Sequence, residues 1–388
     1  MPPIGLTLQI TNVHGWGIYA YHLTIALIRR GIVPLLLSPS PPAVGAPEKP
    51  AIAAAVQQYE ETLRDYLVKA QAAGQAITVS CRTLHALGND FVRSELFHIG
   101  ADDVGSIFFE HAAFSSAGLA AGRRFRRLIA GSRWNAQVLE RHGLTDVVVC
   151  HQGIDPTIFY PGASHDRFGS GRFVVFSGGQ LSLRKGQDIV LAAFARFRQR
   201  HPDAILVTAW HSHWPEHIHA LAGSPYLSSL PLVNGGPSIT AWAVAHGIPE
   251  SHFVDLGPQP NRAFGDVFRN VHVGLFPNRC EGGTNLVAME CLATGVPCIL
   301  ADNTGQKDLV ETIACYPLTR QTAVDPTLMP GGCLEGWGES SVEEIVDLLE
   351  GIYTDYAEAR RRGLHAADTM RQWGWSLQAD RIVDVLVG

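Results

Sequence analysis

Short apolar runs alternate with amphipathic stretches along most of the chain. A short apolar run bounded by turn residues is typical of a buried strand, and apolar residues at helical spacing indicate a covering helix. Regular alternation of the two favours parallel sheets with helices on their faces. In the first part of the chain we expect strands at 4–11, 32–37, 76–83, 105–109, 128–131 and 146–150, and helices at 18–30, 51–73, 123–127 and 134–142.

Segment 161–171 is rich in turn residues and has no periodicity, so it is interpreted as a linker. The 388 residues also exceed what one hydrophobic core usually supports. We therefore predict an α/β protein with two doubly wound, Rossmann-like domains, 1–165 and 166–370, and a C-terminal helix in 371–388 that packs back on the first domain. After the linker we expect strands at 172–177, 204–210, 252–256, 272–276 and 297–301, and helices at 187–199, 239–246, 262–269, 284–294 and 376–386.

Composition narrows the class of protein. Hydrophobic residues make up 46% and charged residues 17% of the chain, as in ordinary globular proteins. The net charge of −6 gives no electrostatic basis for binding nucleic acid. One local basic run is interpreted as a solvated helix face, with a membrane surface or an anionic acceptor as the alternative partner. This run consists of Arg123, Arg124, Arg126 and Arg127.

The seven cysteines include no Cys-x-x-Cys pair. This pattern favours a reducing compartment over a disulfide framework or a thiolate zinc site. The chain begins directly with a strand-like segment and contains no apolar stretch of bilayer-spanning length. We expect a cytoplasmic protein that is at most peripheral to the inner face of a membrane.

The first candidate site is a glycine motif between a strand and a helix. Gly15, Gly17 and Ala20 have the Gly-x-Gly-x-x-Ala spacing, which lets the backbone approach a phosphate or sugar. An NAD site would also carry a carboxylate at the end of the second strand, and residues 37–40 contain none. A dehydrogenase is therefore disfavoured. The other interpretation is a tight turn that needs glycine only for its backbone angles.

The second candidate site is the loop 177–186, which follows a strand of the second domain. Gly179 precedes the adjacent cations Arg184 and Lys185. Two cations at the carboxyl end of a strand can neutralise a diphosphate leaving group. The alternative is a solvated pair of loop residues.

The third candidate site is segment 277–290, in which a glycine turn leads into a helix. Thr284 or Asn285 can cap that helix, and the amides of 283–286 can then hold phosphate. Glu290 lies among apolar residues, so its carboxylate needs donors, which a ribose diol would supply. The alternative is a glutamate that faces solvent.

Three segments together resemble the retaining glycosyltransferases of family four. Residues 153–161 are similar to the Gly-x-Asp-x-x-x-Phe-x-Pro linker of that family, residues 177–186 to its Lys-Gly loop, and residues 281–295 to its paired-glutamate segment. The resemblance covers nearly the whole chain. It implies the GT-B fold, with chemistry in a cleft between the domains, the donor nucleotide on the second domain and the acceptor mainly on the first.

The resemblance also implies roles for single residues. Lys185 would bind the donor diphosphate, Glu290 the ribose, and Glu281 the hydroxyls of the transferred sugar. Backbone amides would come from Gly282, Gly283 and Thr284, and Gly15 and Gly17 would approach the donor from the opposite wall.

Two departures from the family pattern concern this site. Gln180 stands where the family has an arginine, and Arg184 is the candidate replacement. Eight residues rather than seven separate Glu281 from Glu290, so Gly282 is the position that aligns with the first glutamate. We expect a one-residue bulge to let Glu281 still reach the sugar, with a structural pairing to Arg279 as the alternative.

Histidines supply the remaining candidates. His85 and His111 are each expected to follow a strand of the first domain, and either could lie near the transferred sugar. A buried, hydrogen-bonded histidine is the alternative for both. A cluster of four lies in an apparent loop without the spacing of a metal-binding helix, so we expect no metal site. Its members are His211, His213, His217 and His219.

The expected reaction is metal-independent transfer of a hexose from a UDP- or GDP-sugar to an acceptor hydroxyl, with retention of configuration. No permanently bound cofactor is expected, and the acceptor would be a carbohydrate, a lipid-linked or a small molecule, not a nucleic acid. The alternatives are another GT-B enzyme, such as a nucleotide-sugar epimerase or a phosphorylase, and a non-catalytic carbohydrate-binding or scaffolding protein.

Overall fold

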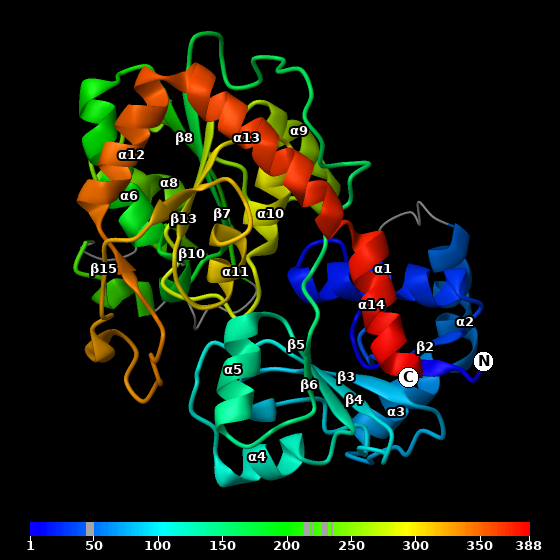
Figure 1. Ribbon diagram of the computed structural model, residues 1–388. Coiled ribbons are helices and arrows are strands. Elements are labelled where there is room, and N and C mark those ends of the chain that lie inside the picture. The colour runs from blue at the N-terminus through cyan, green and yellow to red at the C-terminus, as the bar shows by residue number, and fades with distance from the viewer. Residues whose placement is uncertain (44–49, 213–217, 219, 227–231, 234–235) are drawn as a thin grey trace. The chain divides into compact units, whose positions relative to one another are not determined.

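The computed structural model describes residues 1–43, 50–212, 218, 220–226, 232–233 and 236–388. The chain forms two compact units (Figure 1). The first unit consists of Met1–Gly153 together with Trp373–Gly388, and the second of Ile154–Gln372. The boundary therefore lies after Gly153 rather than near residue 165.

The first unit is built on a parallel six-stranded sheet with the order β2-β1-β3-β4-β5-β6. The order reverses direction at β1, as it does in doubly wound sheets. Its strands are β1 (Ile4–Leu6), β2 (Pro34–Leu36), β3 (Thr83–Leu87), β4 (Val104–Ile107), β5 (Arg127–Ala130) and β6 (Val147–Val149). Its helices are α1 (Gly15–Arg29), α2 (Pro50–Thr62), α3 (Arg64–Ala72), α4 (Ser116–Gly122), α5 (Arg133–Arg141) and α14 (Trp375–Val387), with a 3₁₀ turn at Asn89–Phe91.

The C-terminal helix α14 packs against α1 within this unit. Arg30 bonds to Asp380 at 3.2 Å, and Arg82 donates a hydrogen bond to the carbonyl oxygen of Leu386. The side chain of Trp375 is buried and its ring is stacked on His22 at 4.9 Å. The last residues of the chain therefore complete the core of the unit that the first residues begin.

The second unit has a parallel six-stranded sheet with the order β11-β8-β7-β12-β13-β14 and two antiparallel pairs, β9-β10 and β15-β16. Its strands are β7 (Phe173–Gln180), β8 (Ala204–His211), β9 (Leu232–Val233), β10 (Gly236–Pro237), β11 (Phe253–Asp255), β12 (Val273–Phe276), β13 (Cys298–Ala301), β14 (Tyr316–Leu318), β15 (Gln321–Thr322) and β16 (Glu339–Ser340). Its helices are α6 (Gln187–Arg200), α8 (Ile239–Ala245), α9 (Phe264–Arg269), α10 (Leu286–Ala293), α11 (Lys307–Val310), α12 (Val342–Thr354) and α13 (Tyr356–Met370). Short 3₁₀ turns lie at Leu183–Lys185, Ala220–Gly223, Glu250–His252, Asn261–Ala263, Thr304–Gln306, Pro326–Leu328 and Arg371–Trp373.

Helices cover both faces of the second sheet. Figure 1 shows α6, α8 and α12 on one side of β7, β8 and β13, and α10 and α13 on the other. The central strands β12 and β13 are buried along their whole length, as parallel strands with two covered faces must be. Because all six strands run in the same direction, the loops after β7, β12 and β13 leave from the same edge of the sheet.

The α/β class and the two parallel sheets confirm the fold expected from the sequence, but several element boundaries were wrong. The third strand lies at Thr83–Leu87 rather than at 76–83, where Ile77 forms only an isolated bridge with Phe97. A polar residue, His85, lies in this buried strand and conceals it from a hydrophobicity pattern. The expected helix 51–73 is two helices separated at Leu63, whose φ of −114° interrupts the helical backbone.

The basic run does not form a helix face. Helix α4 ends at Gly122, before the run begins, and Arg127 is the first residue of β5. Arg126 donates to the C-terminal carbonyl oxygen of Gly388 at 2.7 Å, and Arg127 pairs with Asp146 at 2.7 Å. These two side chains therefore tie the edge of the first unit together.

Candidate functional site

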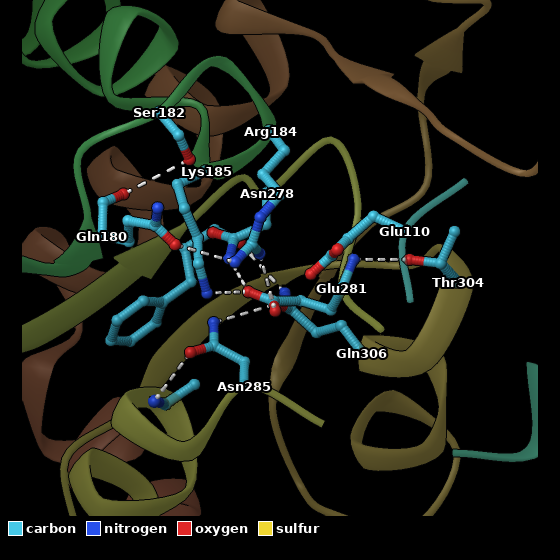
Figure 2. A network of polar contacts seen from close by, with 12 residues as sticks. Glu110, Gln180, Ser182, Arg184, Lys185, Asn278, Glu281, Asn285, Thr304 and Gln306 are labelled. Atoms are coloured by element: carbon cyan, nitrogen blue, oxygen red, sulfur yellow. Dashed lines mark hydrogen bonds and ion pairs between the residues drawn. The ribbon is translucent and has the colours of Figure 1, made fainter. Parts of the chain in front are cut away.

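Three loops meet at the carboxyl edge of the second sheet (Figure 2), and backbone hydrogen bonds connect them. The amides of Arg279 and Cys280, after β12, donate to the carbonyl oxygen of Arg184, after β7, at 2.7 and 3.2 Å. The amide of Gly305, after β13, donates to the carbonyl oxygen of Glu281 at 2.9 Å. The Thr304 hydroxyl accepts a hydrogen bond from the amide of Glu281 at 2.9 Å. The two loops predicted as separate candidate sites therefore form one site.

Gly186 makes the close approach of these loops possible. Its φ is +69°, a left-handed conformation that side chains disfavour. A Cβ atom at this position would also lie 2.4 Å from the carbonyl oxygen of Pro277. Both reasons require glycine after Lys185, and sequence reasoning gave this residue no role of its own.

Lys185 and Arg184 both pair with the carboxylate of Glu281. The Lys185 ammonium bonds to Oε1, and Nη1 of Arg184 lies 3.2 Å from Oε2. The Asn278 amide donates to the same carboxylate, which Figure 2 shows at the centre of the contacts. Glu281 is 5% exposed.

The charge state of Glu281 follows from these partners. Burial alone would raise the pKa of its carboxyl group, but the charges of Lys185 and Arg184 and the hydrogen bonds from Lys185 and Asn278 lower it below the usual value. Glu281 is therefore an ionised carboxylate held against two cations. The alternative interpretation, in which Glu281 pairs with Arg279, is wrong.

Gln180 occupies the place where the resembled family has an arginine. Its side-chain oxygen accepts a hydrogen bond from Nη2 of Arg184 at 3.3 Å. The guanidinium of Arg184 thus lies between Gln180 and Glu281, which supports it as the replacement for the missing arginine. Gly179, in the same strand end, has a φ of +128°, which turns the chain toward Arg184 and Lys185.

Arg279 anchors the loop 277–283 to the protein interior. Its guanidinium is fully buried and bonds to both carboxylate oxygens of Asp188, at 2.8 and 2.6 Å. Glu339 contacts the same guanidinium at 2.8 Å, and the carbonyl oxygen of Leu183 accepts from it at 2.7 Å. This network was not predicted from the sequence, because its members come from distant parts of the chain.

Helix α10 begins at this site. Asn285, with a φ of 65°, caps the helix by accepting a bond from the amide of Ala288 at 3.4 Å. Thr284, the other predicted cap, instead directs its hydroxyl to the sulfur of Met289 at 3.0 Å. The Asn285 amide also donates to Gln306 at 3.0 Å, which fixes the cap against the third loop. Gly282, Gly283 and Thr284 are buried in the turn that leads into the helix.

Glu290 lies one and a half turns into α10 and is 2% exposed. Nδ2 of Asn261 donates to its Oε1 at 2.6 Å. Burial raises the pKa of Glu290 to about 8, a bond from Asn261 opposes the increase, and the charge of Asp155 adds to it. The interpretation of Glu290 as a solvent-facing residue is therefore wrong.

The glycine motif of the first unit belongs to helix α1 rather than to a loop. His14 caps the helix by accepting from the amide of Gly17 at 3.1 Å, so Gly15 and Gly17 form its first turn. A Cβ atom on Gly17 would lie 2.7 Å from the amide nitrogen of Thr11. Close packing explains this glycine, and neither glycine has a positive φ.

The two candidate histidines lie in different settings. His85 is buried inside β3, and its Nε2 lies 2.9 Å from Asp103, so it is the hydrogen-bonded core histidine given as the alternative. It does not follow the strand and is withdrawn as a catalytic candidate. His111 lies after β4, where its backbone amide donates to Asn89 at 3.2 Å, and it stays a candidate.

The cluster of four histidines is only partly described. His211 is the last residue of β8 rather than part of a loop. His213, His217 and His219 lie outside the described residues. Among the residues that are described, no group of three histidine, cysteine, aspartate or glutamate side chains is arranged to hold a metal ion. Within the same ranges, no helix combines the length and apolar character needed to span a bilayer.

Part of the second unit matches a family of known proteins. Residues 259–382 match the family described as "Family 4 Glycosyltransferase in conflict systems", a region that includes the loop 277–285, helix α10 and Glu290. No curated protein matches the chain by sequence.

Solved structures of glycosyltransferases share the fold over nearly the whole chain. A sucrose-phosphate synthase from Thermosynechococcus elongatus is 16% identical with a TM-score of 0.65, and the alignment covers 99% of this chain and 98% of that one. WaaG, a glycosyltransferase involved in lipopolysaccharide biosynthesis, is 12% identical with a TM-score of 0.62 and 99% coverage of both chains. HepE of Anabaena, solved in complex with UDP-glucose, is 15% identical with a TM-score of 0.60, covering 100% of this chain and 99% of that one. The GT-B fold predicted from the sequence is confirmed.

Proposed function

We propose that this chain, a glycosyltransferase of the GT-B fold, transfers a hexose from a nucleoside diphosphate sugar to an acceptor hydroxyl with retention at the anomeric carbon. The observation that carries the proposal is the pair of cations, Lys185 and Arg184, held at the carboxyl edge of the second sheet beside the first turn of α10. Cations and a helix N-terminus in one place can hold a diphosphate. HepE, which has the same fold, was solved with UDP-glucose, and this supports a UDP-sugar as the donor.

Each residue of the site has one part in the proposed reaction. Lys185 and Arg184 hold the diphosphate and stabilise the charge that develops as the glycosidic bond to phosphate breaks. Glu290 accepts hydrogen bonds from the ribose hydroxyls, and Glu281 orients the hydroxyls of the transferred sugar. The leaving diphosphate takes the proton of the acceptor hydroxyl, so the protein supplies positioning and charge rather than a nucleophile. The acceptor, a carbohydrate, a lipid-linked or a small molecule, would bind mainly to the first unit. From the same unit, Gly15 and Gly17 are the candidates to approach the donor, and His111 is the candidate to lie near the transferred sugar.

The test is the release of free nucleoside diphosphate from UDP-, GDP- and ADP-sugars, measured with and without candidate acceptors. A transferase releases nucleoside diphosphate slowly with water and faster with its acceptor. An epimerase would convert the sugar nucleotide without releasing diphosphate, and a phosphorylase would require inorganic phosphate. Absence of release with every donor would leave the non-catalytic alternative.

Chelators should not reduce turnover. We propose that protein cations and helix-end amides take the place of a divalent metal. Lys185 and Arg184 support this, because they bring two cations together at the proposed donor site. The measurement is the rate of diphosphate release in EDTA, with and without added Mn²⁺. A loss of turnover in EDTA that Mn²⁺ restores would contradict the proposal.

Glu281→Gln should lower kcat by about tenfold and should not weaken UDP binding. The contact with the sugar strengthens as charge develops, so its loss affects turnover. UDP affinity is preserved, because glutamine removes the anion that now occupies Lys185 and Arg184. Single-turnover kinetics and UDP titration measure the two effects, with Glu311→Gln, 43% exposed in its side chain, as the control. If kcat of the Glu281→Gln variant equals that of Glu311→Gln, Glu281 has only a structural role.

Glu290→Gln should make the folding stability less dependent on pH. The pKa of Glu290 is about 8 in the folded chain and about 4.5 in the unfolded chain. Between these two pH values the carboxyl group is therefore protonated in the folded state and ionised in the unfolded state. Stability therefore falls as pH rises through this window, by at least about 1 kcal/mol. Urea unfolding at pH 5, 6.5 and 8 should show a smaller decrease for the variant than for the natural chain. Parallel pH profiles for the two proteins would mean that Glu290 has an ordinary pKa.

A further inference from the structure

A polar cavity of about 260 Å³ lies in the second unit at the edge of the sheet opposite the donor site. Residues Asn270–His272 line it just before β12 begins, and Thr294 and Val296 line it just before β13. The proposed donor loops follow the other ends of these same strands. The length of the sheet therefore separates the cavity from the site described above.

Positive charge dominates the walls of this cavity. Arg269, from α9, and Arg360, from α13, both line it, and none of the described lining residues carries a carboxylate. Among the described residues, neither guanidinium has a carboxylate within ion-pair distance. Asp266, on the same helix as Arg269, pairs with Arg167 at 2.6 Å. The charges of Asp166 and Asp203 act on His272, and Asp203 accepts a hydrogen bond from Tyr353 at 3.1 Å.

Both guanidiniums are held in place by backbone groups and aromatic rings. Arg269 donates to the carbonyl oxygen of Ile158 at 3.3 Å and lies over the ring of Tyr160, 5.0 Å from its centroid. Arg360 donates to the carbonyl oxygen of Gly295, in the turn that ends α10. An arginine has five N–H donors, so each side chain keeps further donors beyond these anchoring bonds.

Neutral polar side chains complete the lining of the cavity. Nδ1 of His272 accepts a bond from the amide of Val174 at 3.1 Å, which places the proton of the neutral ring on Nε2. Burial lowers the pKa of His272, so the neutral ring is its dominant form at pH 7. The carboxamide of Asn270 accepts from Ser164 and from the amide of His165, and this fixes the loop that forms one wall. Tyr356 adds a phenolic hydroxyl from the first turn of α13.

We propose that this cavity binds the phosphate group of a small anion. Arg269 and Arg360 form no ion pair with a carboxylate among the described residues. Guanidiniums with N–H donors bind phosphate through charge-assisted hydrogen bonds. The volume lies below the range of drug-sized pockets, so the ligand is inorganic phosphate or a small phosphate monoester rather than a nucleotide. This site does not depend on the proposed transferase reaction.

The test is calorimetric titration of the full chain with inorganic phosphate, at ionic strength matched with chloride. All proteins carry Lys185→Ala, which weakens phosphate binding at the proposed diphosphate site to the same extent in each of them. Arg269→Gln and Arg360→Gln should each raise the Kd for phosphate by about tenfold. The matched control is Arg361→Gln on the same helix, whose side chain is 74% exposed and pairs with Glu358, and it should bind as the parent does.

The two cavity variants remove different anchoring bonds, so one of them decides the test if the other unfolds, as circular dichroism would show. Equal phosphate affinity in all four proteins, or no binding by the Lys185→Ala parent, would overturn the proposal. A second titration identifies the source of the phosphate group. Tighter binding of a hexose monophosphate or glycerol phosphate than of phosphate would identify an ester as the ligand, and weaker or equal binding would identify inorganic phosphate.

Discussion

Lys185→Ala should lower kcat/KM for the donor by about two to three orders of magnitude. The side chain of Lys185 is 10% exposed, and its ammonium group bonds to the carboxylate of Glu281. A bound diphosphate would take the place of this carboxylate as the partner of the ammonium group. A preorganised charge in such a place stabilises the leaving group without reorganisation of water. Arg184→Ala should have a smaller effect, because its guanidinium is more exposed, at 20%, and is shared with Gln180.

The matched control for Lys185→Ala is Lys307→Ala, since Lys307 is 53% exposed and only 4.0 Å from Glu311. Steady-state kinetics and UDP titration give kcat/KM and Kd for each protein. The double variant Lys185→Ala/Glu281→Gln separates two explanations of a loss. If the loss arose only from leaving Glu281 buried without its cation, the double variant would recover UDP binding. If UDP binding stays weak in the double variant, Lys185 itself binds the diphosphate. Equal and small effects of Lys185→Ala and Arg184→Ala would show that this loop is not part of the donor site.

Arg279→Ala should lower the free energy of unfolding by about 3–5 kcal/mol. The guanidinium is fully buried between Asp188, itself fully buried, and Glu339. Removing it leaves two carboxylates in a low-dielectric interior without the cation that compensates them. The carbonyl oxygen of Leu183 and the loop 277–283 lose their anchor in the same step.

Urea unfolding measures this effect, with Arg320→Ala as the control. Arg320 is 58% exposed and pairs with Asp347 at 2.8 Å, so its loss should lower the free energy of unfolding much less than the loss of Arg279 does. Arg279→Lys should give an intermediate value, because an ammonium keeps the charge but cannot bond to both oxygens of Asp188 at once. Similar small losses for Arg279→Ala and Arg320→Ala would show that the buried network contributes no more than a surface ion pair.

The fold class followed from local information. Apolar runs and helical spacing repeat within short windows. The strands next to the proposed donor site show this: β12, β13 and the first four residues of β7 are apolar and buried. The strand β3 was misplaced because a satisfied polar residue interrupts it. Only the tertiary contact between His85 and Asp103, the residue before β4, makes that histidine acceptable in the core.

The types of residue in the candidate site could be predicted from the sequence, but the contacts between these residues could not. Adjacent cations after one strand and glutamates around a glycine turn after another could be read from the chain. Which groups meet was decided by the order of strands in the sheet, since β7 and β12 are neighbours although a long segment separates them.

The sequence by itself therefore determined that this protein has two parallel α/β units and that Lys185, Glu281 and Glu290 lie in loops or helices at strand ends. Only the tertiary structure decided that Glu281 bonds to Lys185 and Arg184, while Arg279 turns away to Asp188, 91 residues earlier in the chain. The physical reason is the separation along the chain of the residues that interact. Hydrophobic periodicity is a property of neighbouring residues, whereas the partner of a buried charge is set by which loops the sheet brings within a few ångströms.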